Sequence, residues 1–269
     1  MVVRGFSLAE RGVSEAIGFI LIFSIVIAGI GLVTLYGYPM LLKQQTSANE
    51  RIMEKNMIVL QNDVKSLAYK TVPYKETSLK IDGGSLTVYN STSTPAVSRL
   101  DIRDCDPSGD EYIGAFQSGD LRYSSESAGT DISLQNGAVV MRPHAEPGSV
   151  MLAEPRWFYD AQTNTMVINL IGFNSSYTIA RAGIGTVQMA MGETGYTRVD
   201  IPAGNLLCVV YTPDPTPEGQ NYQVAWDNYF INSMKMTPTG TDHEYRLPTD
   251  VTNPAILVIK KYDVIIKSL

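Results

Sequence analysis

The hydrophobic pattern of this chain is dominated by one long apolar stretch near the N-terminus. No charged side chain occurs between Glu15 and Lys43, and residues 16–42 read AIGFILIFSIVIAGIGLVTLYGYPMLL. An α-helix rises about 1.5 Å per residue, so this stretch would form a helix of roughly 40 Å. The hydrocarbon core of a bilayer is about 30 Å thick. We therefore predict a membrane-spanning helix over residues 13–42.

A more polar helix is expected to follow the apolar one. Residues 44–69 contain neither glycine nor proline, and apolar side chains recur there at alternating spacings of four and three. These side chains are Met53, Met57, Leu60, Val64 and Leu67. The stripe predicts an amphipathic extension over residues 43–72 that packs on the following domain and ends before Pro73. Pro39 predicts a bend near the junction, because proline removes one helical hydrogen bond.

Beyond Pro73 the pattern changes to short β-strands. Residues 78–81 and 85–89 flank Asp82-Gly83-Gly84, which is typical of a hairpin turn because glycine accepts positive φ. Further strands are expected at residues 137–141, 149–153, 165–171, 186–191, 206–211, 222–231 and 255–266. Many short strands separated by turn residues favour an antiparallel β-sandwich or an open barrel over residues 76–269. The predicted fold class is α+β, a long N-terminal helix followed by a sandwich-like β domain.

The segment between residues 104 and 137 has little sustained apolar patterning. We predict a long exposed loop with at most one or two short strands around residues 112–116. Residues 104–109, DCDPSG, match the opening of a calcium-binding loop. The twelfth position of such a loop should be a bidentate Glu, and here it is Ala115. A solvated acidic turn is therefore the favoured interpretation, and no metal site is predicted.

Charge and motif content argue against several classes of function. The net charge of −6 and the pI near 5.0 argue against nucleic acid as a partner. The chain has two histidines, His144 and His243. It has no Walker loop and no Gly-x-Ser-x-Gly, His-Glu-x-x-His or Cys-x-x-Cys motif. We therefore predict no enzymatic activity and no cofactor.

Three interpretations of the apolar stretch compete. A secretory signal peptide has an apolar region of about 7–15 residues and then a small-x-small cleavage site, whereas this run is about twice as long and ends in Tyr36-Gly37-Tyr38-Pro39. An uncleaved membrane anchor fits the length and the absence of charge. The third interpretation rests on Glu15, because a carboxylate at the margin of a spanning helix is costly to bury and usually has a partner.

A cut between Gly12 and Val13 would supply that partner, because the new α-amino group would lie close to Glu15 in sequence. Residues 10–19, ERGVSEAIGF, combine a short charged leader with a direct entry into the apolar helix. On these residues the chain resembles the archaeal type IV pilin and pilin-like surface protein family. The resemblance covers about 30 residues. It implies that a prepilin peptidase removes residues 1–12 and leaves the apolar helix in place.

The resemblance also implies a function. In polymerising members of that family the helix first anchors the subunit in the membrane and later packs in the filament core, where Glu15 would pair with the Val13 amine. The expected role is a pilin-like subunit, in a minor or tip position given the large β domain, that associates with other subunits through its N-terminal helix. The alternative is a monomeric membrane-anchored protein whose extracellular domain binds a ligand or surface. Arg4 and Arg11 precede the helix and favour a cytoplasmic leader with an exported β domain.

Export would give a role to two further features. Cys105 and Cys208 are the only cysteines, and outside the cell they could form a disulfide, the alternative being two buried thiols. Asn90 and Asn174 each begin an Asn-x-Ser/Thr sequon and are candidate N-glycosylation sites.

Overall fold

The computed structural model describes residues 8–70, 72–92, 98–105, 112–177, 179–213, 221–241 and 243–269, and the side chains of residues 8–15 and 112 lie outside that description. The chain divides into two compact units, Met1–Ala48 and Asn49–Leu269. In the first unit, every described residue is helical. The second unit, called the head from here on, contains all the described strands.

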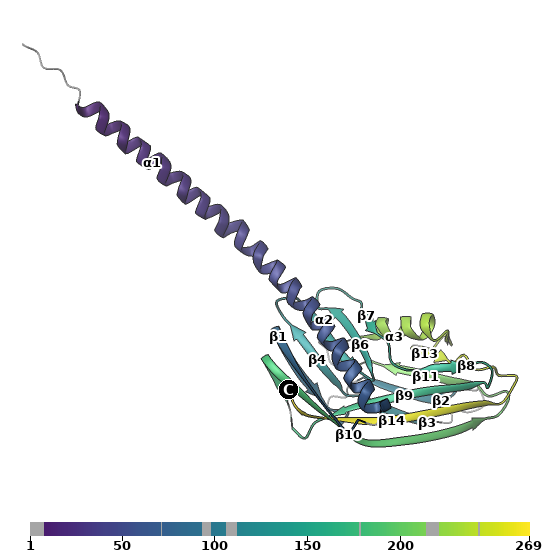
Figure 1. Ribbon diagram of the computed structural model, residues 1–269. Coiled ribbons are helices and arrows are strands. Elements are labelled where there is room, and N and C mark those ends of the chain that lie inside the picture. The colour runs from purple at the N-terminus through teal and green to yellow at the C-terminus, as the bar shows by residue number, and fades with distance from the viewer. Residues whose placement is uncertain are drawn as a thin grey trace, which may run out of the picture. The chain divides into compact units, whose positions relative to one another are not determined.

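The N-terminal helix is continuous with one irregular turn. It comprises α1 (Leu8–Leu32), a π-helical turn η1 (Val33–Gly37) and α2 (Tyr38–Lys70), whose second half belongs to the head (Figure 1). In the irregular turn the backbone N–H of Tyr38 donates to the carbonyl of Val33, five residues earlier. Pro39 has no N–H to donate, so a wider turn directly before it accommodates the missing bond. The disturbance predicted at Pro39 is therefore a local π turn, and the helix continues through it.

The head is built from two β-sheets. Its strands are β1 (Tyr74–Tyr89), β2 (Arg99–Asp104), β3 (Tyr112–Gln117), β4 (Asp120–Ser125), β5 (Thr130–Gln135), β6 (Ala138–Pro143), β7 (Val150–Ala153), β8 (Phe158–Asp160), β9 (Thr165–Asn174), β10 (Ala180–Ile201), β11 (Leu207–Thr212), β12 (Thr237–Pro238), β13 (Glu244–Arg246) and β14 (Ala255–Ser268). A short helix α3 (Gln223–Asn228) and a π turn η2 (Tyr229–Ser233) lie between β11 and β12.

The nine-stranded sheet has the order β7-β6-β5-β4-β1-β10-β14-β9-β8, and the five-stranded sheet has the order β12-β13-β11-β2-β3. Among the described pairs only β9 and β14 are parallel. The prediction of an α+β fold with a mostly antiparallel β domain is confirmed. Because the two sheets are separate, the structure is a sandwich-like arrangement and not a barrel.

One face of the nine-stranded sheet is covered by the second half of α2. The five side chains of the predicted stripe are at most 1% exposed and form a core with apolar residues of β1, β4, β5, β9, β10 and β14. The head therefore begins at Asn49 and not at residue 76, since this part of the helix supplies one wall of its core. A fragment that begins at residue 76 would leave that face of the sheet open to water.

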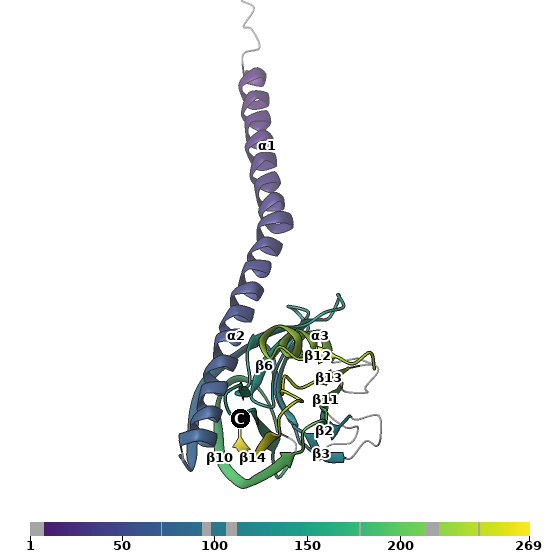
Figure 2. The ribbon, with the colours of Figure 1, turned by 90° about the vertical axis from the view of Figure 1, so that its right-hand side faces the viewer.

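The other face of the nine-stranded sheet packs on the five-stranded sheet and α3. Met166, Ile168 and Leu170 of β9 point into this second core, whereas Ile171 and Phe173 join the core under α2. Figure 2 shows the order of the layers, with α2 on one side and β11 and β13 on the other. Strands that bury both faces carry apolar side chains in continuous runs, which is why β9 lacks the alternation of a half-exposed strand.

The hairpin predicted at Asp82-Gly83-Gly84 is wrong. β1 runs through these residues as one strand and pairs with β10 on both sides of a register shift. Gly83 has a φ of 72°, and a Cβ on Gly84 would lie 2.3 Å from the carbonyl oxygen of Ser124. The glycines therefore permit a bulge and a close approach to β4. The positive φ and the missing Cβ that suggested a turn are used in this bulge.

The strand predicted over residues 222–231 is also wrong, because this segment forms α3 and η2. The buried aromatic side chains are Tyr222, Trp226, Tyr229 and Phe230. Their spacing is helical, and the ring centroids of Trp226 and Phe230 lie 5.6 Å apart. Aromatic residues have a high β propensity, which is why the sequence predicted a strand here. Packing of the same side chains against the sheet selects a helix.

The long loop predicted between residues 104 and 137 contains three strands, β3, β4 and β5. All six residues of β5 are buried. Polar side chains pair with one another inside the head. Nη2 of Arg122 lies 2.8 Å from Oδ2 of Asp120, and the hydroxyl of Ser133 donates a hydrogen bond to the same oxygen at 2.7 Å. Strands whose buried residues are polar and hydrogen-bonded to one another do not show the apolar periodicity from which strands are predicted. Residues 106–111 of the predicted acidic turn lie outside the described residues.

The contribution of α2 to the head can be measured at two adjacent positions. Leu60 is fully buried and Val59 is 49% exposed. Leu60→Ala should lower the free energy of unfolding of the head by about 3 kcal/mol, because it leaves a cavity. Val59→Ala should lower it by less than about 0.5 kcal/mol. Denaturant unfolding of the detergent-solubilised chain, followed by tryptophan fluorescence, tests this difference. Equal effects would show that the helix does not pack as described.

Candidate functional site

The apolar segment of residues 16–42 has no protein partner among the described residues. Every residue in it is exposed except Gly31, which is partly buried. The hydroxyls of Ser24 and Thr34 donate to carbonyls one turn earlier, at 2.7 and 2.9 Å. By length and composition the part of the helix from Ala16 onward could cross a membrane, and an apolar window of it has a mean hydropathy of 2.8 and is 0% buried. Such a surface suits lipid or other apolar helices.

The predicted processing site lies near the start of α1. The backbone of Gly12, Val13 and Glu15 is helical, because α1 begins at Leu8. Their side chains lie outside the described part of the structure. The cleavage between Gly12 and Val13 and the pairing of Glu15 therefore stay predictions from the sequence.

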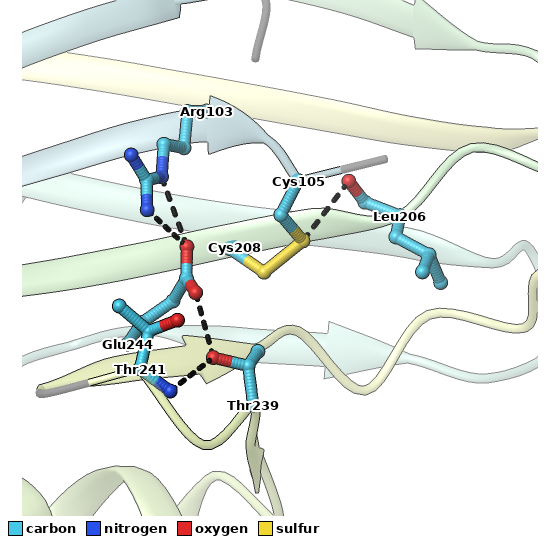
Figure 3. The surroundings of a disulfide bond; sticks show 7 residues. All are labelled: Arg103, Cys105, Leu206, Cys208, Thr239, Thr241 and Glu244. Atoms are coloured by element: carbon cyan, nitrogen blue, oxygen red, sulfur yellow. Dashed lines mark hydrogen bonds and ion pairs between the residues drawn. A yellow bond between two sulfur atoms is a disulfide. The ribbon is translucent and has the colours of Figure 1, made fainter. Parts of the chain in front are cut away.

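Cys105 and Cys208 form a disulfide in the five-stranded sheet (Figure 3). Cys105 directly follows β2 and Cys208 lies in β11, with Cα atoms 5.7 Å apart. The backbone N–H of Cys105 also donates to the carbonyl of Leu206 at 2.8 Å. The bond joins residues 103 positions apart in sequence. In the chain-entropy model a loop of this length corresponds to about 4–5 kcal/mol of stabilisation.

An ion pair lies beside the disulfide. Arg103 of β2 donates from Nε to Oε1 of Glu244 at 2.9 Å, and Thr239 donates to Oε2 at 2.6 Å (Figure 3). Burial raises the pKa of Glu244, but the hydrogen bonds from Thr239 and Arg103 and the Arg103 charge outweigh this effect and leave the pKa below its usual value. β2, β11 and β13 are thus tied together covalently and by charge.

The two predicted glycosylation sites contact each other. Asn90, just after β1, accepts hydrogen bonds at Oδ1 from the N–H and Oγ of Ser175 at 2.7 and 3.0 Å, and its Nδ2 donates to the Ser175 carbonyl at 3.0 Å. In return, Oδ1 of Asn174 accepts from the N–H and Oγ of Ser91 at 3.2 and 2.7 Å. The two sequons therefore form one reciprocal clasp between the ends of β1 and β9.

The clasp distinguishes the two asparagines as glycan acceptors. N-glycosylation modifies the side-chain nitrogen Nδ2. In Asn90 this atom donates a hydrogen bond to the Ser175 carbonyl, whereas Nδ2 of Asn174 has no hydrogen-bond acceptor within the described part of the chain. On a glycosylating cell surface we expect Asn174 to carry glycan and Asn90 to stay unmodified in folded protein. Glycopeptide mass spectrometry tests this, with Asn174→Gln as the control that should remove the modification. Full occupancy of Asn90 would contradict the clasp.

The two histidines have separate partners. His144 follows β6, and its Nε2 lies 2.9 Å from Oδ1 of Asp131. His243 has Nδ1 at 2.7 Å from Nε2 of Gln223. Oδ2 of Asp131 also accepts a hydrogen bond from Nε of Arg142 at 3.3 Å. Within the described residues, no group of three His, Cys, Asp or Glu side chains could hold a metal ion.

The carboxylate of Asp131 makes the stability of the head depend on pH. Burial raises its pKa, but hydrogen bonds from Ser124, His144 and Arg142 and the His144 charge outweigh burial and lower the pKa. A lowered pKa contributes stability above the ordinary carboxyl pKa of about 4, and this contribution is lost as pH falls through the folded-state pKa.

Asp131→Asn should therefore lower the free energy of unfolding by about 1–3 kcal/mol at pH 7, because it removes the charge of a buried carboxylate that accepts hydrogen bonds from its neighbours. It should also reduce the acid sensitivity of the head below about pH 4. Asp200→Asn removes the same charge from an exposed ion pair with Arg198 and should cost less than about 0.5 kcal/mol. Denaturant unfolding at pH 3, 5 and 7 tests the pair of variants. An acid dependence equal to that of the unmodified chain would refute the assignment.

A feature that sequence reasoning missed is a basic groove in the head. We use this name for the surface formed by Lys65, Tyr69, Lys70, Arg156, Lys260 and Tyr262. These residues come from the last turns of α2, the segment before β8, and β14. No local motif joins them, because only the packing of α2 on the sheet brings the three segments together.

Comparison with known proteins identifies a family for the chain. No curated protein and no solved structure matches it significantly. A family of unknown function, DUF7289, matches residues 11–246. This range covers both the apolar helix and most of the head, and it is well over half of the 269 residues. The chain therefore belongs to the DUF7289 family.

Proposed function

We propose that this protein is a pilin-like subunit of an archaeal type IV-type surface filament. The observation that carries the proposal is the helix over residues 16–42, which is apolar on all sides and unpartnered within the described chain. A helix of this kind needs lipid before assembly and other apolar helices after it. The role is structural and assigns no catalytic step to the chain.

The proposed life cycle starts at the membrane. A prepilin peptidase removes residues 1–12, the helix over residues 13–42 anchors the chain, and the head lies outside the cell. The Cys105–Cys208 disulfide supports an exported head, because disulfides persist in oxidising compartments. Arg4 and Arg11 support a cytoplasmic leader.

Assembly then depends on the start of the mature chain. Helices packed in a filament core exclude water, so the Glu15 carboxylate needs a compensating charge there. The α-amino group of Val13 supplies that charge after cleavage, either within a subunit or between neighbours. The proposed partners are therefore other copies of the chain or other pilin subunits, which contact it through the N-terminal helix.

A second candidate function is a monomeric anchored protein whose head binds a ligand or surface. The observation that favours it is the basic groove, which has cations without carboxylate partners among the described residues. Filament incorporation separates the two candidates, because an anchor that never polymerises would keep Glu15 at the membrane interface, solvated and dispensable.

The proposal predicts that Glu15→Ala abolishes incorporation into filaments while membrane insertion and export of the head continue. Removing one partner of a buried ion pair costs about 3–5 kcal/mol, here for every subunit that enters the core. Electron microscopy of purified filaments, mass spectrometry of their subunits and protease accessibility of the head on whole cells measure the three properties.

Glu10→Ala is the matched control, because it removes the same charge from the leader that cleavage discards. Its subunits should assemble normally, and N-terminal sequencing should find Val13 first in both variants. Normal assembly of the Glu15 variant, or filaments that never contain this chain, would favour the monomeric anchored protein. A mature chain that starts at Met1 would refute the processing step.

A further inference from the structure

The basic groove consists of two adjoining cavities on one surface of the head. Their volumes are about 630 and 300 Å³, and both are lined by Tyr69 and Arg156. Lys65 and Lys70 line the larger cavity, and Lys260 and Tyr262 line the smaller one. No carboxylate lines either cavity. The groove is therefore an extended cationic surface on a chain whose net charge is −6.

Arg156 is the centre of this surface. Its guanidinium stacks over the ring of Tyr69 at 4.9 Å from the centroid. No hydrogen-bond or ion-pair partner of this guanidinium occurs among the described residues. Stacking orients the planar fork while all its N–H donors stay available. An oriented, unpaired guanidinium suits a planar carboxylate, which it can bind through two parallel hydrogen bonds.

The neighbouring lysines add charge without being neutralised. Within the described part of the chain, Lys65, Lys70 and Lys260 have no carboxylate at ion-pair distance. Lys65 donates one hydrogen bond to the backbone carbonyl of Glu154 at 3.2 Å, and this carbonyl is a neutral acceptor. Burial lowers the pKa of Lys65, the Arg156 charge lowers it further, and Glu154 opposes both effects. The groove therefore carries a positive field that an anion would relieve.

Neutral polar groups line the same surface. Tyr69 and Tyr262 contact edge to face at 5.5 Å between centroids. Burial raises the pKa of both phenols, so each stays protonated and can donate a hydrogen bond. Asn62 and Ser66 line the larger cavity and Asn169 lines the smaller one. Amides, hydroxyls and aromatic rings beside fixed cations suit a ligand that has hydroxyl groups as well as acid groups.

We propose that the basic groove binds an acidic saccharide, with a carboxylate of one sugar on Arg156 and the next sugar unit in the adjoining cavity near Lys260. Tyr69 and Arg156 line both cavities, and in this proposal the chain of sugars crosses these two residues from one cavity to the other. The hydroxyl groups of the sugars face the phenols and amides. This site is separate from the apolar helix, and its existence does not depend on whether the chain forms filaments.

The test uses the full-length chain in neutral detergent and a fluorescent tetragalacturonate probe. We expect saturable binding that weakens with salt. Lys260→Gln should weaken it by about tenfold, which is the loss of one charge-assisted hydrogen bond, and Arg156→Gln by at least about tenfold, because the guanidinium makes two. Arg198→Gln removes the same charge from an exposed ion pair on β10 and should leave binding unchanged. Unchanged unfolding midpoints would show that the variants remain folded.

Two further ligands test the class of compound. The fully methyl-esterified tetramer has the same rings without charge and should bind at least about tenfold more weakly. Inorganic phosphate should not compete at concentrations similar to those of the probe. Equal binding of the ester, equal competition by phosphate, no binding of the probe, or an equal loss in Arg198→Gln would each overturn the proposal.

Discussion

The head depends on the contact between the second half of α2 and the nine-stranded sheet. That sheet is apolar on both faces, so it needs two covers to exclude water. The five-stranded sheet covers one face and the stripe of residues from Met53 to Leu67 covers the other. The helix that begins as an exposed apolar segment thus ends as part of a folded core. One continuous helix therefore carries both the exposed apolar segment and one wall of the core of the head.

Buried polar contacts fix the geometry of the strands around this core. Asp120, Arg122 and Asp131 are buried in β4 and β5, where unpaired charges would be costly. Arg142 of β6 is partly exposed and pairs with Asp131. The disulfide, the Arg103–Glu244 pair and the asparagine clasp tie strands from distant parts of the chain. These cross-links hold the strands of the head in register, and the disulfide among them persists in oxidising compartments.

The two proposals assign different tasks to the two units. In these proposals the apolar segment serves attachment and assembly, and the basic groove serves recognition. Arg156 and Tyr69 can act only if α2 is packed in place, because Tyr69 lies in the last turn of that helix. The same packing that stabilises the head therefore also builds the proposed ligand site.

The sequence by itself determined the features that follow from local pattern. The charge-free stretch predicted the apolar helix, and a spacing of four and three predicted the buried face of α2. Short apolar runs predicted β1, β6, β7, β9, β10, β11 and β14. The tertiary structure decided what depends on distant partners. Asp82-Gly83-Gly84 forms a bulge because β4 lies against it. The segment around Trp226 is helical because its aromatic side chains pack in the core between the two sheets. β4 and β5 lacked an apolar signal because their polar residues satisfy one another. The disulfide, the clasp between Asn90 and Asn174 and the basic groove join residues that only folding brings within contact distance.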